Sequence, residues 1–95
     1  MEKTTTIELI EKESIPQLTF RHTEPEVQNP LEIRRQLSIA LILGNAQKHK
    51  VRLVFDSDSG LKMVHTTIWE LDDQHVVLKR GVSIPVDNII EVNLL

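Results

Sequence analysis

The sequence predicts a mainly β, α+β fold, with one N-terminal helix followed by a five-stranded antiparallel small barrel. Apolar side chains recur at helical spacing after Pro30, and from Lys50 onward the apolar period changes to that of strands. Short turns rich in Asp, Ser and Gly then separate the strands at regular intervals, which is typical of a small barrel. The length of 95 residues fits a single domain.

The helix is predicted from its start signal and its apolar stripe. Asn29 is a favourable N-cap residue, and Pro30 suits the first helical position. Gly44 followed by Asn45 predicts a left-handed stop, which leaves open whether residues 46–49 extend the helix. The apolar stripe consists of Leu31, Ile33, Leu37, Ala40, Leu41 and Ile42.

Five strands are predicted after the helix. The second is long enough that we expect it to bend, and Pro85 prevents a ladder hydrogen bond after the fourth. Residues 86–88 then predict one turn of 3₁₀-helix before the last strand. The predicted strands span residues 51–56, 61–71, 75–79, 82–84 and 89–94.

The first part of the chain predicts an arm rather than a regular element. We assign residues 1–30 to a partly ordered N-terminal arm and residues 31–95 to the helix and barrel. A strand is conceivable over 4–10, but prolines interrupt any longer element. Proline and charge leave little to bury, so we expect residues 1–3 and part of 22–30 to be mobile.

Apolar side chains on both faces of the second strand predict that something covers the outside of the barrel. Trp69 lies on one face, where a large aromatic side chain is expected to fill the core. Val64 and Ile68 lie on the opposite, outer face, as Val54 does on the first strand. The helix is the nearest candidate to cover this face and a second subunit is the other, and we expect a homodimer formed through this outer stripe or through the C-terminal edge. The predicted interface residues are Val54, Val64, Ile68 and Leu94.

Charge and composition argue against a membrane and disfavour nucleic acid as a partner. The net charge is −3, and the basic residues are scattered among the acidic ones. No apolar run is long enough to span a membrane, and the acidic N-terminus does not resemble a signal peptide, so we expect a cytoplasmic protein. The candidate basic patch, which we interpret as a solvated face, consists of Lys48, Lys50, Arg52, Lys79 and Arg80.

No catalytic, cofactor-binding or metal-binding residue is predicted, and we expect no enzyme activity. The four histidines lack the spacing of metal ligands, and the chain has no cysteine. Residues 56–60 resemble the start of a calcium loop, but Thr66 stands where that loop needs a glutamate. Aspartates are common in turns for their own hydrogen-bonding reasons, so we interpret these acids as turn residues.

The predicted layout over residues 31–95 resembles the SH3-like small barrels, and among them the Sm-like proteins. Residues 83–92 look like the final strand pair of that family, and residues 60–78 have the hydrophobic rhythm of its first motif. His65 stands where the family has a glycine, and His75 where it has the base-contacting asparagine. The resemblance therefore implies the fold without the RNA-binding residues.

Two further resemblances concern small barrels of this outline. One is to the Rho-binding antiterminator type, which implies binding to a protein. The other is to short uncharacterised barrel proteins of the Bacteroidetes, through the Leu-Gly-Asn end of the helix at 43–45 and the Thr-Thr-Ile-Trp strand at 66–69.

We predict a non-catalytic protein–protein interaction module whose partner the sequence does not identify. The alternative is an Sm-like RNA-binding protein or a transcriptional or post-transcriptional regulator.

Overall fold

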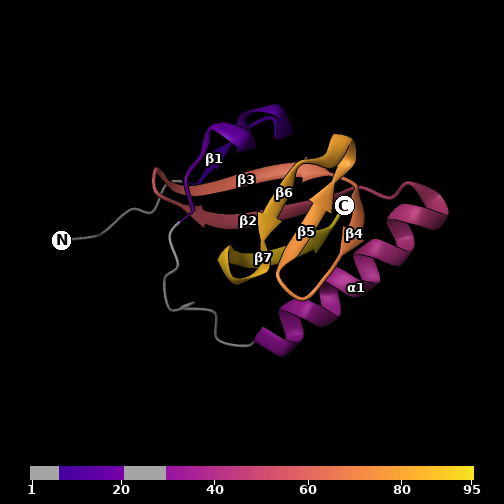
Figure 1. Ribbon diagram of the computed structural model, residues 1–95. Coiled ribbons are helices and arrows are strands. Elements are labelled where there is room, and N and C mark those ends of the chain that lie inside the picture. The colour runs from indigo at the N-terminus through magenta and orange to yellow at the C-terminus, as the bar shows by residue number, and fades with distance from the viewer. Residues whose placement is uncertain (1–6, 21–29) are drawn as a thin grey trace.

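The computed structural model describes residues 7–20 and 30–95, which form one long helix and two β-sheets (Figure 1). The four-stranded sheet has the order β1-β3-β2-β7, and the three-stranded sheet has the order β4-β5-β6. The helix α1 spans Pro30–Gln47, and the strands are β1 (Glu8–Leu9), β2 (Val51–Ser57), β3 (Gly60–Thr66), β4 (Ile68–Leu71), β5 (His75–Leu78), β6 (Ser83–Pro85) and β7 (Ile89–Leu94). The prediction of an α+β, mainly β fold is confirmed.

The predicted closed barrel is wrong, because the strands of the described residues form two separate sheets. The bend expected in the long second strand lies at Thr67, the single residue between β3 and β4, and each half joins a different sheet. β6 ends at Pro85, which has no N–H to donate, and the 3₁₀ turn η3 (Val86–Asn88) follows it directly. No ladder therefore joins β6 to β7 in the described part of the chain.

The helix begins at the predicted residue but ends later than the Gly44 stop. Leu37 and Ala40 are buried on its inner face, which packs against β4 and β7. The predicted stripe was too wide, because Leu31 and Ile42 are 80% and 65% exposed. The left-handed residue that ends the helix is Lys48, with φ 54°. Neither α1 nor any other helix in the described ranges is long and apolar enough to cross a membrane.

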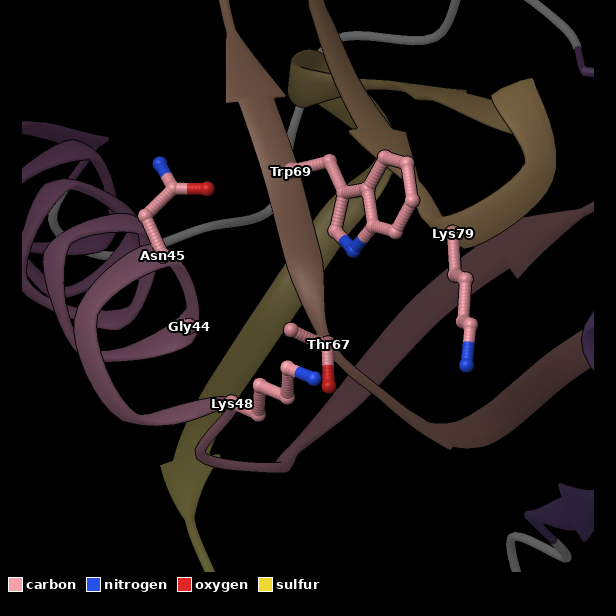
Figure 2. Close-up of a pocket in the computed structure, with 6 residues that line it drawn as sticks. All are labelled: Gly44, Asn45, Lys48, Thr67, Trp69 and Lys79. Carbon is pink, nitrogen blue, oxygen red and sulfur yellow. The ribbon is translucent and has the colours of Figure 1, made fainter.

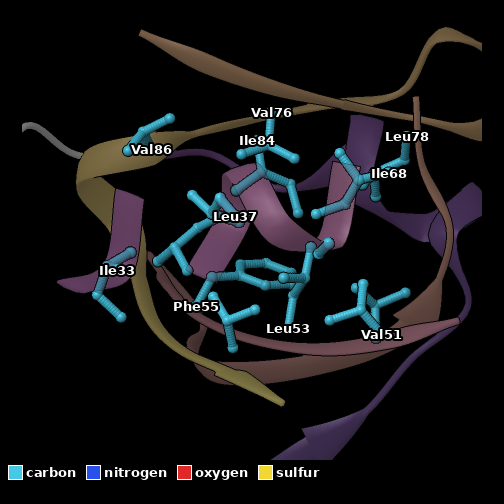
Figure 3. Packing of buried hydrophobic residues seen from close by; sticks show 14 of the residues in the cluster. Ile33, Leu37, Val51, Leu53, Phe55, Ile68, Val76, Leu78, Ile84 and Val86 are labelled. Carbon is cyan, nitrogen blue, oxygen red and sulfur yellow. The ribbon is translucent and has the colours of Figure 1, made fainter. Parts of the chain in front are cut away.

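The core lies between the helix and the two sheets (Figure 3). Val51, Leu53 and Phe55 point into it from β2, as their alternation along the strand requires. Val64 and Ile68 are also fully buried there, so their assignment to the outer face is wrong. A small domain needs every large apolar side chain it can bury, and the neighbouring sheet supplies cover for both.

The described part of the N-terminal segment belongs to the same core. β1 pairs in parallel with β3, and the buried Lys62 ammonium contacts the Glu8 carboxylate at 2.5 Å. Ile15, in the 3₁₀ helix η1 (Lys12–Gln17), is buried in the core, and the rings of Phe20 and Phe55 lie 5.8 Å apart. Residues 7–20 therefore help to close the core. The expected mobility of residues 1–3 and 22–30 concerns positions outside the described ranges, apart from Pro30.

Candidate binding groove

A surface groove of about 380 Å³ lies where the C-terminal end of α1 meets the start of β4 (Figure 2). The helix end lies on one side of β4, and β5, which pairs with β4, lies on the other. Its lining residues come from the end of α1 and the residue after it, from β4 and the residue before it, and from the residue that follows β5. They are Gly44, Asn45, Lys48, Thr67, Trp69 and Lys79.

Gly44 sets how closely the helix approaches the strand. A Cβ at this position would lie 2.7 Å from the Ile68 carbonyl oxygen and 2.9 Å from the Thr67 methyl group. Both distances are shorter than van der Waals contact, so a side chain here would push the helix away from β4. Gly44 was predicted as a helix stop, but its role is this close approach within the last turns of the helix.

Trp69 is the main apolar group of the groove. Trp69 follows the fully buried Ile68 on β4, where the register of the β4–β5 pairing shifts, and 49% of its surface is exposed. The prediction of a core tryptophan is wrong because the two faces of this strand were exchanged. In Figure 2 the indole ring lies over the groove beside Lys79, with the helix end on its other side.

Lys48 and Lys79 supply the positive charge of the groove. Lys48 follows the last residue of α1, and Lys79 opens the short 3₁₀ turn η2 (Lys79–Gly81) after β5. Neither ammonium forms an ion pair with another described residue, and no described carboxylate lines the groove. Asn45 and Thr67 add an amide and a hydroxyl, which can donate and accept hydrogen bonds.

The predicted basic patch is divided by the structure. Lys48 and Lys79 meet at the groove, whereas Lys50, Arg52 and Arg80 do not line it. Arg52 Nε lies 3.3 Å from Nε2 of His65 on the neighbouring strand, and Lys50 is exposed on the connection from α1 to β2.

Arg80 does not line the groove and lies close enough to the N-terminal segment to affect the pKa of Glu13. The pKa of Glu13 on η1 lies below its usual value, mainly through its own backbone hydrogen bond and then through Lys12, and Arg80 adds a smaller attraction. Arg80 has φ 71°, in the left-handed region.

Three of the four predicted interface residues are not available at the surface. Val54, Val64 and Ile68 are all buried within the single chain, so they form no outer stripe. Leu94 remains, with 48% of its surface exposed at the end of the edge strand β7.

Asp72 has a structural role in the turn between β4 and β5, whereas Asp56, which was interpreted as a turn residue, lies within β2. The Asp72 carboxylate accepts hydrogen bonds from the backbone N–H groups of Gln74 and His75, at 2.7 and 2.6 Å, and these bonds hold its pKa below the usual value. The segment that resembles a calcium loop is the hairpin turn between β2 and β3, where the Ser57 hydroxyl donates to the Gly60 carbonyl. Within the described ranges, no three histidine or acidic side chains come together as a metal site would require.

The groove residues that were not predicted as site residues are Gly44, Asn45, Thr67 and Trp69. These residues belong to the Leu-Gly-Asn stretch 43–45 and the Thr-Thr-Ile-Trp stretch 66–69, on which one of the resemblances rests. The two stretches lie far apart in the chain and meet at the groove. Comparisons with protein-family models, with curated proteins and with solved structures found no match for this chain.

Proposed function

We propose that this protein is a non-catalytic interaction module that holds a segment of a partner protein in the groove, with Trp69 as its apolar anchor. The observation that carries the proposal is the half-exposed Trp69 in a groove beside the C-terminal end of α1. Tryptophan is enriched among the few interface residues that supply most of the binding energy, because its large flat side chain loses much water-exposed area on contact.

The chemistry of the groove supports binding over catalysis. Its polar groups are one amide, one hydroxyl and two ammonium groups, and no described histidine or carboxylate lies among them to act as a general base for the hydroxyl. The core between the sheets is filled by the protein's own side chains, so a ligand would have to bind at the surface.

We also propose that α1 and strands β2–β7 form an opened variant of an SH3-like, Sm-like small barrel. The bend between β3 and β4 at Thr67 and the 3₁₀ turn between β6 and β7 support this proposal. Binding of a partner at a surface groove or a sheet edge is compatible with this fold, because proteins that share a fold bind different ligands.

Single-stranded RNA is the second candidate ligand. Trp69 between two lysines offers a surface on which a base can stack, a feature expected to be missing from the basic patch. A protein segment is favoured because the groove contains only one aromatic ring and the whole chain carries a charge of −3.

The proposal is tested by selecting binders of the unaltered protein from a random peptide library displayed on phage, and then measuring the affinity of the selected peptides for the Trp69→Ala variant. We expect selected peptides that bind the unaltered protein about 30-fold more tightly than Trp69→Ala, the ratio that corresponds to a hot-spot residue. The matched control is Ile90→Ala, which truncates another part-exposed apolar side chain on β7 and should leave the affinity unchanged. Selected peptides that bind Trp69→Ala as tightly as the unaltered protein would contradict the proposal. In a parallel binding assay, oligouridylate that binds the unaltered protein more tightly than Trp69→Ala would favour the RNA candidate.

We propose, independently of the groove, that two copies associate along β7. β7 is an edge strand of the four-stranded sheet, and Leu94 and Leu95 at its end are exposed. An edge strand whose end is apolar and carries no charged side chain favours pairing with another chain.

A further inference from the structure

The backbone at Lys48 is unusual for a lysine. Lys48 and Arg80 are the two non-glycine residues with positive φ in the described part of the chain. Lys48 takes the position after the helix, where its N–H donates to the Gly44 carbonyl at 2.9 Å and where glycine is the residue that the backbone favours. A side chain kept in a strained backbone position is typical of functional sites.

The side chain of Lys48 reaches the groove that contains Trp69. Lys79, the first residue of η2, lines the same groove, so positive charges enter it from two different parts of the chain. No described carboxylate compensates them within the groove, although the chain as a whole is acidic. Two uncompensated ammonium groups beside an apolar ring are complementary to a segment that carries carboxylates next to an apolar residue.

We infer that the partner of the groove is an acidic protein segment, with carboxylates at Lys48 and Lys79 and an apolar side chain against Trp69. This inference rests on the proposed function of the groove and specifies the chemical class of its ligand. Lys48 is then a binding residue that is kept in place of the glycine that would better stabilise the helix end.

Arg80 provides a matched control for this role. It shares the left-handed backbone of Lys48 but does not line the groove. Lys48→Gly and Arg80→Gly should both raise the urea midpoint of unfolding, because glycine adopts positive φ without strain. Only Lys48→Gly should weaken binding. Lys48→Gln and Lys79→Gln remove one charge each without the gain in stability that glycine brings at a position with positive φ.

The probes are synthetic peptides with a leucine pair flanked by glutamates, by glutamines or by lysines, together with oligouridylate. Trp69 is the only tryptophan and the chain has no tyrosine, so intrinsic fluorescence reports directly on the groove. We expect the glutamate peptide to bind most tightly and the lysine peptide most weakly. We expect the affinity for the glutamate peptide to fall about two- to fivefold in each of three variants, Lys48→Gly, Lys48→Gln and Lys79→Gln. This range corresponds to the loss of a surface ion pair. Arg80→Gly should leave its affinity unchanged.

The outcomes separate this inference from the proposed function. Equal binding of the glutamate and glutamine peptides, with loss of both in Trp69→Ala, would overturn the acidic ligand and leave the groove as a peptide site. Equal weakening by Arg80→Gly and Lys48→Gly would overturn the assigned role of Lys48. Fluorescence changes with oligouridylate alone would overturn both proposals in favour of nucleic acid.

Discussion

Gly44 shows how a single residue sets the distance between α1 and β4. Helix propensity alone predicts that Gly44→Ala stabilises the protein by about 1 kcal/mol. The Cβ would lie 2.7 Å from a backbone oxygen that cannot rotate away, so we expect overpacking to dominate and the variant to lose about 1–3 kcal/mol. Urea unfolding measures this difference. Ala46→Gly, at an exposed position of the same helical turn, is the control and should cost about 1 kcal/mol through propensity alone. Stabilisation by Gly44→Ala would mean that the helix does not approach the strand so closely.

The charge of Asp72 predicts a pH-dependent contribution to stability. Its folded-state pKa is lowered by the N–H groups of Gln74 and His75, so the ionised carboxylate stabilises the turn. This contribution is fully present above the unfolded-state pKa and is lost as the pH falls through the lower folded-state pKa. The urea midpoints of the unaltered protein and Asp72→Asn should therefore differ at neutral pH and converge in acid. A difference that stays constant down to the acid limit would contradict this role.

At the scale of the helix, docking depends mainly on Leu37. Its side chain is fully buried, whereas Leu41 is only partly buried against the core. We expect Leu37→Ala to cost about 2–5 kcal/mol in the free energy of unfolding and Leu41→Ala to cost less. Ile42→Ala, at an exposed position of the same helix, is the control and should change stability by no more than about 0.5 kcal/mol. If the urea midpoint hardly moves for Leu37→Ala, α1 is not docked as described.

The elements were more predictable than the way in which they pack. Pro30 marks the helix start and Pro85 the end of β6, because proline restricts its own backbone wherever it stands. The role of Gly44 was not predictable, since a glycine that ends a helix and one that admits a neighbouring strand look the same in sequence. The faces of β4 were exchanged because both are partly apolar, and the alternation that identifies a strand does not say which face is covered. The division into two sheets likewise depends on long-range pairing.

The groove was only partly predictable for the same reason. Lys48 and Lys79 are among the predicted basic residues, but their meeting at one groove is not predictable from the sequence. The two lysines are 31 positions apart, and they meet only because β4 pairs with β5 and α1 docks beside β4. Trp69 is predicted in the core, and this prediction excludes from the candidate site the one apolar residue that lies beside both lysines.

At the scale of the whole molecule, association of two copies is the next prediction. With Val54, Val64 and Ile68 buried, the exposed end of β7 is the part of the predicted interface that remains. We expect light scattering over a concentration series to give a dimer mass, and Leu94→Lys to shift it to the monomer because a lysine blocks edge pairing. A monomer mass for the unaltered protein at several hundred micromolar would contradict the proposed dimer and would leave the groove unaffected.

The binding role of the groove is tested most directly by the indole N–H resonance of Trp69. The chain contains one tryptophan, so a ¹⁵N-labelled sample gives a single indole signal that needs no assignment. During titration with a selected peptide, we predict that this signal shifts and saturates together with the backbone signals of Gly44, Asn45 and Thr67. Saturable binding that moves backbone signals elsewhere and leaves the Trp69 indole signal in place would contradict the groove as the binding site.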